Sequence, residues 1–234
     1  MSTRFALFPV LALLLVLFAT TVERTARAEK EPASRSSYLE IEIDVPRTGT
    51  EAEAVDVARR ARNAAATRRD GCAASHVVRL DDAGALLRAT VWTHLGALEA
   101  ASLAADGSDE EKAMQAVIDP RRRAKVQFRL LREYKHQDGE AGYLEVVIYR
   151  TKPGTTREAN LELFDAAREG FAGGEGLLSH AIGLSADGRW VHLLYWREGA
   201  DYTKTSKSLM RVPAVLRWIR SLDFKRFRVY KGDT

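Results

Sequence analysis

Alternating aromatic and apolar side chains in residues 190–196 have the types and spacing to bind a flat aromatic molecule. Side chains in a β-strand repeat with a period of two, so every second residue shares one face. One face of this segment holds Trp190, His192, Leu194 and Trp196. Indole rings stack on aromatic ligands, and an imidazole can accept a phenolic proton or hydrogen-bond the resulting oxyanion. The segment therefore predicts the floor of an aromatic-binding site with His192 as its polar group.

The same alternation is also typical of a protein core. Trp and Leu at a period of two are most often buried against other apolar side chains, and a lone histidine among them usually has a backbone or carboxylate partner. We therefore keep two interpretations of His192 and place the structural one before the catalytic one.

Two apolar segments on either side of a tight turn predict a β-hairpin over residues 176–196. The turn contains Asp187-Gly188, and glycine accepts the positive φ that such turns require. A second hairpin with the same pattern is predicted over residues 73–93, with Asp82-Ala83-Gly84 in its turn. The shared residues lie at a constant offset of 104 positions, which relates Ser75-His76, Leu80, Gly84 and Trp92 to Ser179-His180, Leu184, Gly188 and Trp196. This offset indicates an internal duplication.

Both copies predict the element order β-α-β-β-α-β. The first occupies residues 38–134, a polar linker follows at 135–142, and the second occupies 143–234. The first helix of each copy begins at a predicted capping box, which is formed by Thr50 and Glu53 or by Thr155 and Glu158. The chain is therefore expected to be α+β, with tandem ferredoxin-like repeats. Each sheet has an apolar face that must be covered, and the two sheets can cover each other.

Charged residues in the first repeat have a simple structural interpretation. The polar face of strand 38–45 is acidic and consists of Glu40, Glu42 and Asp44. These side chains could face Arg79 and Arg88, but we expect a solvated edge. The basic run at residues 121–123 is likewise expected to be a solvated turn.

The remaining histidines indicate structure and not metal binding. His76 and His180 each follow a serine at equivalent positions, which favours packing between sheet and helix. A two-residue turn would place His180 and His192 on opposite faces, and no Asp or Glu stands nearby at ligand spacing. We therefore predict no metal site.

The arrangement G-x-x-S-H…S-x-D-G…W, from Gly176 to Trp196, resembles the antibiotic biosynthesis monooxygenase superfamily. In that superfamily two ferredoxin-like subunits pair their sheets into a dimeric α+β barrel, and each subunit holds a small cavity between sheet and helices. The resemblance covers both repeats and is clearer in the second. It implies an intramolecular dimeric α+β barrel, and hence a monomer that acts as a pseudo-dimer.

Members that oxygenate polycyclic phenols use neither metal nor flavin. They hold the aromatic substrate as its anion, which reacts directly with dioxygen. Their motif places an Asn four residues before the Trp and a Tyr six residues after it. Here Trp196 and Tyr202 match, and His192 stands at the Asn position. The corresponding residues of the first repeat are Arg88, Trp92 and Leu98.

The resemblance therefore implies a site in the second repeat that needs no cofactor. Its catalytic candidates are His192, Trp196 and Tyr202, and its substrate-binding candidates are Trp190, Leu194, Arg88 and Trp92. Trp196 also has a core interpretation, because the Trp recurs in the first repeat, and Tyr202 also fits an exposed helix face.

Two functions follow from different classes of protein. The first is a cofactor-independent monooxygenase-like protein that acts on an aromatic or quinone-like small molecule in the C-terminal repeat. The alternative is a non-catalytic, exported binding or structural barrel, which the missing Asn and the degenerate first repeat favour. A haem protein is disfavoured, because haem-binding relatives use a histidine in the helix after the Trp and residues 197–210 contain none.

The N-terminus predicts export. Arg4 precedes an apolar run, and Ala26-Arg27-Ala28 follows as a cleavage site, so residues 1–28 are expected to be a signal peptide and 29–37 a flexible lead-in. The alternative is an uncleaved anchor, which would be the chain's only membrane contact. The mature protein is expected to be periplasmic or secreted, and its single Cys72 forms no internal disulfide.

The charge of the chain gives no reason to expect nucleic acid as a partner. The net charge is +4, and residues 1–28, with three arginines and one glutamate, carry +2 of it, which leaves +2 for the mature chain. Nucleic-acid binding needs a concentrated basic face. The expected partner is a small aromatic molecule.

Overall fold

The pattern of apolar residues predicted one hairpin and its accompanying helices in each half of the chain, and the computed structural model contains them. It describes residues 36–80 and 84–234. The predicted signal segment and residues 82–83 of the first hairpin turn lie outside the described residues. Within the described part, every helix is too short or too polar to cross a bilayer.

Each half has the predicted element order. The elements of the first half are β1 (Tyr38–Asp44), α2 (Ala52–Thr67), β2 (Cys72–Arg79), β3 (Leu86–Trp92), α3 (Leu95–Ala105), α4 (Asp109–Val117), a 3-10 turn (Pro120–Arg122) and β4 (Ala124–Lys135). The elements of the second half are β5 (Tyr143–Tyr149), α5 (Arg157–Ala172), β6 (Leu177–Leu184), β7 (Trp190–Trp196), α6 (Gly199–Leu209), α7 (Pro213–Arg220), a 3-10 turn (Phe224–Arg226) and β8 (Arg228–Asp233).

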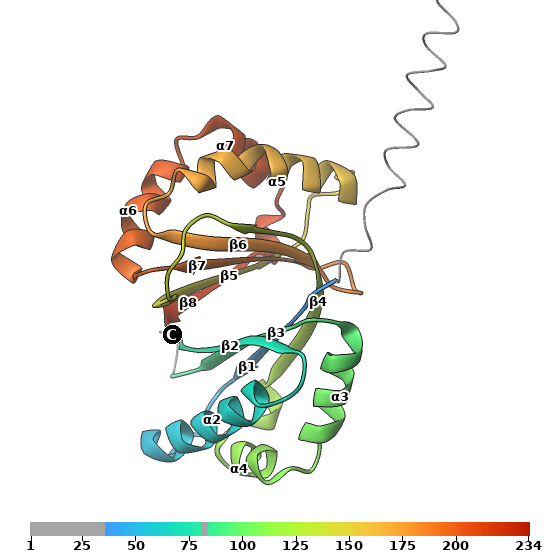
Figure 1. Ribbon diagram of the computed structural model, residues 1–234, viewed down its shortest axis with the longest axis vertical. Coiled ribbons are helices and arrows are strands. Elements are labelled where there is room, and N and C mark those ends of the chain that lie inside the picture. Colours follow the sequence, from blue (N-terminus) through green and yellow to red (C-terminus); the bar gives the residue numbers. More distant parts are fainter. Residues whose placement is uncertain (1–35, 81–83) are drawn as a thin grey trace, which may run out of the picture. The chain divides into compact units, whose positions relative to one another are not determined.

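The eight strands form one antiparallel sheet in the order β2-β3-β1-β4-β6-β7-β5-β8. Strand β4 belongs to both halves, because its first part pairs with β1 and its last part pairs with β6. The two halves of the sheet face each other, and the helices cover their outer faces (Figure 1). The fold is therefore an α+β barrel built from two ferredoxin-like halves of one chain.

Apolar side chains from both halves fill the interior of this barrel. On β1, Leu39 and Ile41 point inward, and on β7, Val191 and Leu193 do so. Phe128 on the shared strand β4 is completely buried among them. The open sheet faces thus cover each other, as the duplication predicted.

The helix caps differ from the prediction. Helix α2 begins at Ala52 after Glu51, which makes no side-chain cap, and the Thr50 hydroxyl instead bonds the Val117 carbonyl. Helix α5 is capped by Thr156, whose Oγ1 accepts from the Ala159 amide at 3.1 Å, and not by Thr155. In the second half the prediction is wrong by one residue, because two adjacent threonines offer the same hydroxyl.

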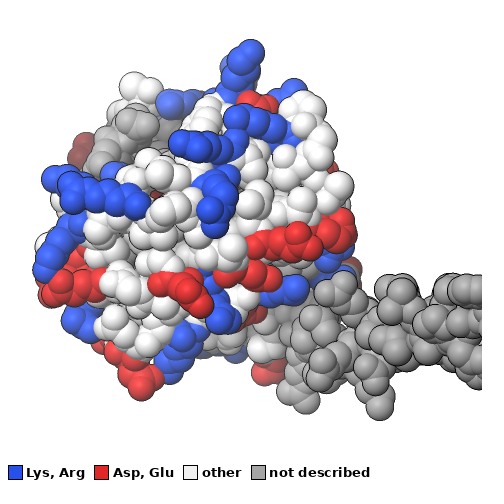
Figure 2. All heavy atoms as spheres, turned by 90° about the horizontal axis from the view of Figure 1, so that it is seen from above, with Lys and Arg blue, Asp and Glu red and all other residues white. Residues whose placement is uncertain are grey.

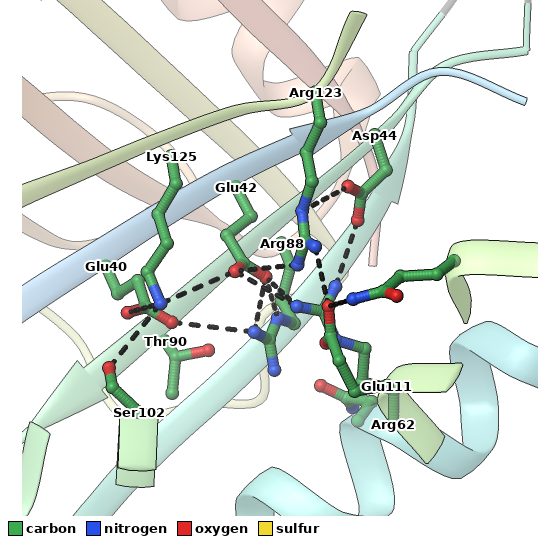
Figure 3. Close-up of polar contacts among 12 residues, drawn as sticks. Glu40, Glu42, Asp44, Arg62, Arg88, Thr90, Ser102, Glu111, Arg123 and Lys125 are labelled. Atoms are coloured by element: carbon green, nitrogen blue, oxygen red, sulfur yellow. Dashed lines mark hydrogen bonds and ion pairs between the residues drawn. The ribbon is translucent and has the colours of Figure 1, made fainter. Parts of the chain in front are cut away.

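The acidic face of β1 is not a solvated edge, so that prediction is wrong. Glu40, Glu42 and Asp44 are at most 4% exposed. They point away from the barrel interior, towards the helices of the first half (Figure 3). Arg79, one of the two suggested partners, bonds the half-buried Asp56 instead.

Four cations surround these carboxylates. Arg62 on α2 bonds Asp44 at 3.1 Å and Glu111 at 2.9 Å, and it also bonds Glu42. The other cations are Arg88, Arg123 and Lys125 (Figure 3). We call these eight residues the charge cluster: Glu40, Glu42, Asp44, Glu111, Arg62, Arg88, Arg123 and Lys125.

The charge cluster changes the titration of its central carboxylate. Burial by itself would raise the pKa of Glu42, but the neighbouring guanidinium groups, Arg88 and Arg62 first, outweigh it and hold this pKa at about 2. Arg123, predicted to lie in a solvated turn, bonds Glu111 at 2.6 Å within the cluster. The basic run is therefore partly a structural element of the first half.

Candidate functional site

A cavity of about 450 Å³ lies between the sheet and the helices of the second half. Strands β5 and β7 form its floor, and α5, α6 and α7 cover it (Figure 1). Met210 and Phe224 line it and are 51% and 57% exposed, so its mouth lies beside them. We call this space the helix-side cavity.

Most of the predicted second-repeat residues meet at this cavity. His192, Leu194 and Trp196 on β7 line it, and Tyr202 reaches it from α6. The Tyr202 ring packs edge-on against the Trp196 indole, with centroids 5.7 Å apart. Trp190 does not line the cavity, because it stacks on buried Tyr149 farther along the strand.

His192 is enclosed by aromatic rings. It is 2% exposed, and the ring centroids of Phe164, Phe171 and Trp218 lie 5.1–5.2 Å from its own. Burial holds its pKa well below the usual value, so the ring is neutral at pH 7. Phe164, Phe171 and Trp218 therefore form the surroundings of the His192 ring, and its Nε2 is buried without a hydrogen-bond partner among the described residues.

Glu145 is a lining residue that the sequence reasoning missed. It lies on β5, where it pairs in register with Leu194 of β7 and Lys231 of β8. Burial raises its pKa to about 7, although the Lys231 ammonium and the Trp196 indole favour the carboxylate. A perturbed carboxyl group in a cavity is a candidate functional group. Its signal was a single Glu in the otherwise apolar strand 143–149.

The first-repeat candidates do not join this cavity. Arg88 belongs to the charge cluster, and Trp92 packs with Leu98 in the first half. Both lie on the outer face of their own half, so the barrel separates them from His192. The equivalent space of about 460 Å³ in the first half is lined by the charge cluster, which gives it a polar wall.

The prediction that His180 and His192 lie on opposite faces is wrong. The loop between their strands has five residues, 185–189, and the register pairs Ile182 with His192. Both imidazoles therefore point towards α5, with centroids 5.4 Å apart. His136 bonds His180, with its Nε2 3.2 Å from the His180 Nδ1. Burial is the first cause that lowers the pKa of His180, to about 3.

The two serine-histidine repeats have different surroundings. His180 packs between sheet and helix as predicted, against Phe164 and Phe171. His76 does not, because it faces the interior of the barrel, 5.0 Å from the Tyr195 ring.

The donors of the helix-side cavity do not fit a haem. An axial imidazole must reach the iron with a ring nitrogen. His192 is the histidine that lines this cavity, and Phe164, Phe171 and Trp218 enclose its ring. Within the described residues there is no group of three or more His, Cys, Asp or Glu that could hold a metal ion.

The face that carries the helices of the second half has no dominant charge. Acidic and basic side chains are interspersed on it, and uncharged residues occupy much of the surface (Figure 2). A surface of this kind does not steer ligands of one charge towards the cavity.

Comparisons with solved structures identify the class of fold. One similar structure is a "putative monooxygenase" from Fusobacterium nucleatum, with a TM-score of 0.63, 8% identity, and coverage of 85% of this chain and 92% of that one. An anthrone oxidase-like protein has a TM-score of 0.58 at 11% identity, with 86% and 92% covered. A mutant chlorite dismutase from Candidatus Nitrospira defluvii has a TM-score of 0.58 at 10% identity, with 89% and 94% covered.

These likenesses define a dimeric α+β barrel. No family model matches the sequence, and no curated protein matches it. At this level of identity the likeness concerns the fold alone. The superfamily to which the chain belongs stays a prediction from the sequence motif. The motif and the solved structures agree on a monooxygenase-like fold.

Proposed function

We propose that this protein is a cofactor-independent monooxygenase-like enzyme whose substrate is an aromatic or quinol-type small molecule bound in the helix-side cavity. The observation that carries the proposal is the meeting of Glu145, His192, Trp196 and Tyr202 around one apolar space of about 450 Å³. Cavities of this size with a few convergent polar groups are typical small-molecule sites.

Glu145 is the proton acceptor in this proposal. A general base works best when its pKa lies near the operating pH, and the pKa of Glu145 is raised to about 7. His192 is a weaker base, because burial depresses its pKa. The neutral imidazole of His192, enclosed by aromatic rings, is instead part of the wall against which the substrate packs. Trp196 and Tyr202 supply aromatic faces for the substrate ring.

The chemistry requires dioxygen as the only co-reactant. Removal of one proton gives an electron-rich substrate anion, which transfers electrons to dioxygen. When a methylene carbon becomes a carbonyl, it takes one oxygen atom from dioxygen, and the second oxygen leaves with the two hydrogens as water. The protein's part is to form the anion, hold it and exclude water.

Glu145→Gln is expected to lower oxygen uptake with anthrone- or quinol-type substrates by about 10²-fold, the lower range for loss of a general base. The substitution keeps the shape of the side chain but removes the group that accepts the proton. Glu158→Gln, on the exposed first turn of α5, is the matched control and should retain full uptake. Oxygen uptake would be followed with an electrode across a panel of such substrates.

A non-catalytic binding barrel is the second candidate. The missing Asn, replaced by the enclosed His192, favours it. Under this alternative, aromatic ligands quench the fluorescence of Trp196 and Trp218 saturably, while no oxygen is consumed by the wild type or by Glu145→Gln. Uptake in the wild type that Glu145→Gln does not reduce would contradict the role of Glu145.

We also propose that the chain works as a monomer. Its two halves already cover each other's sheets, so the fold needs no second copy for this purpose. Sedimentation equilibrium of the mature chain should give the mass of one chain, and a stable dimer would contradict the proposal.

A further inference from the structure

A second cavity, of about 580 Å³, is lined mainly by residues of the barrel interior, and Tyr134 and His180 join its lining from the side that faces α5. Ala74 and Val91 line it from the first half, and Leu193 and Tyr195 line it from the second. Leu130 on the shared strand β4 lies between them. We call this space the interior cavity. Because both halves build it, it depends on the pairing of the two repeats.

The sheet separates the interior cavity from the helix-side cavity. Tyr195 and Trp196 are neighbours on β7, so their side chains point to opposite faces. Tyr195 lines the interior cavity and Trp196 lines the other. The linker between the repeats contributes residues 137 and 139–141 to the lining of the interior cavity.

Two residues that line this cavity, His180 and Tyr195, have a buried polar atom that none of the described residues hydrogen-bonds. The atom of His180 is Nε2, on a ring that packs against Phe164 and Phe171 of α5, and the atom of Tyr195 is the hydroxyl oxygen. Burial first, and then the charge of Glu133, raise the pKa of Tyr195, so the hydroxyl stays protonated and acts as a donor. A buried donor without an acceptor costs folding free energy, and a bound group that accepts its hydrogen bond removes this cost.

The surroundings favour a ligand without charge. The charged lining residues Glu133, Lys135 and Glu140 are exposed, and Lys135 already pairs with Asp138 at 2.5 Å. His76 lies beside Tyr195, and burial lowers its pKa, so it brings no fixed cation. A charged ligand would therefore lose its hydration without gaining a buried counter-ion.

We propose that the interior cavity binds a small, neutral, apolar molecule whose carbonyl oxygen accepts a hydrogen bond from the Tyr195 hydroxyl. The apolar walls hold the body of the molecule, and the hydroxyl fixes its orientation. This site is independent of the proposed oxygenation, because it uses the other face of β7 and none of the residues assigned to that reaction.

The test uses prodan, a neutral naphthyl ketone that fluoresces. Its emission moves to the blue in an apolar site and to the red when its carbonyl accepts a hydrogen bond. Tyr195→Phe is expected to weaken prodan binding about 3- to 10-fold, as for the loss of one hydrogen bond, and to shift the bound emission to the blue. Ala74→Leu fills part of the cavity and should remove this binding.

Matched variants in the helix-side cavity distinguish the two sites. Tyr202→Phe and Ser206→Leu make comparable changes to residues that line it. Both variants should leave the Tyr195-dependent binding and emission of prodan unchanged. If prodan also binds beside Trp196, Ser206→Leu should remove that second binding and Tyr202→Phe should not. Urea unfolding of each variant would verify that it folds like the wild type.

Three results would overturn the proposal. They are the absence of saturable prodan binding to the wild type, binding that neither Tyr195→Phe nor Ala74→Leu alters, and binding that only Ser206→Leu removes. None of them affects the proposed oxygenation, which is measured by oxygen uptake and its loss in Glu145→Gln.

Discussion

Replacing Arg62 by methionine is expected to lower the free energy of unfolding by about 3–5 kcal/mol, the usual cost of breaking a buried ion pair from one side. Its side chain is 8% exposed and bonds three buried carboxylates, Glu42, Asp44 and Glu111. Methionine fills similar space but removes the more deeply buried of the two cations that these carboxylates share, and Arg123 remains. Urea unfolding at pH 7, analysed by linear extrapolation, measures the change.

Arg79→Met is the matched control. The Arg79 side chain is 54% exposed and bonds Asp56 at 2.8 Å. An exposed pair of this kind contributes at most about 1 kcal/mol. If the two variants differ by less than about 1 kcal/mol, the charge cluster is not the buried, mutually dependent network described above.

The surroundings of the charge cluster could not be predicted from the sequence. The alternation along β1 correctly placed Glu40, Glu42 and Asp44 on one face, because a strand fixes which side chains share a face. It did not show what covers that face. The covering cations come from α2, β3 and β4 and the turn before it, and no local pattern connects them to β1.

The fold was predictable for a related reason. Hairpins, a constant offset and polar linkers are local or repeated signals, and each repeat leaves an apolar sheet face that the sheet of the other repeat can cover. Helix ends were less predictable, since Thr155 and Thr156 are chemically alike and packing selects between them. Strand β4 joins the two halves into one sheet, and no local pattern in its residues indicated that it also pairs with β6.

The candidate site was predictable in its aromatic part and not in its acid–base part. Alternation brought His192 and Trp196 to one face, and the motif added Tyr202. Whether a carboxyl or an imidazole titrates near pH 7 depends on burial by distant helices. Here burial raises the pKa of Glu145 and lowers that of His192, so the better base is a residue to which the sequence analysis assigned no role.

The two halves of the fold carry different kinds of side chain at equivalent positions. Positions 42 and 88 of the first half are equivalent to 147 and 192 of the second. The first pair is Glu42 and Arg88 in a buried ion pair, and the second is Val147 and His192 in an apolar wall. Among the described residues, this space therefore holds paired charges in the first half and an apolar pocket in the second.

Buried histidines in that wall are expected to make the protein sensitive to mild acid. His180 and His192 are at most 2% exposed and neutral. Burial is the first cause that lowers both pKa values; the further causes are His136 and Arg168 for His180, and His180 for His192. Below pH 6.5 the unfolded chain binds protons that the folded chain does not, so stability falls as the pH falls. Each histidine should remove about 2 kcal/mol between pH 7 and pH 5, and the loss at His180 continues towards its folded pKa of about 3.

The measurement is urea unfolding of the wild type and of the His180→Leu/His192→Leu double variant at several pH values between 7 and 5. Between pH 7 and pH 5 the free energy of unfolding of the wild type should fall by about 4 kcal/mol relative to that of the double variant, since only the wild type carries the buried imidazoles. Glu145 acts in the opposite direction, because its raised pKa stabilises the folded state as the pH falls below 7, but it is present in both proteins and cancels. The carboxylates of the charge cluster also cancel.

Leu161→Ala controls for a general loss of stability. Leu161 is buried in the same core as Trp196, and its truncation should cost about 2–5 kcal/mol at every pH, because no proton is involved. Its difference from the wild type should therefore stay constant between pH 7 and pH 5. If the difference for the double variant is equally constant, His180 and His192 take up protons in the folded state as they do in the unfolded chain. The description of both as buried, neutral imidazoles would then be wrong.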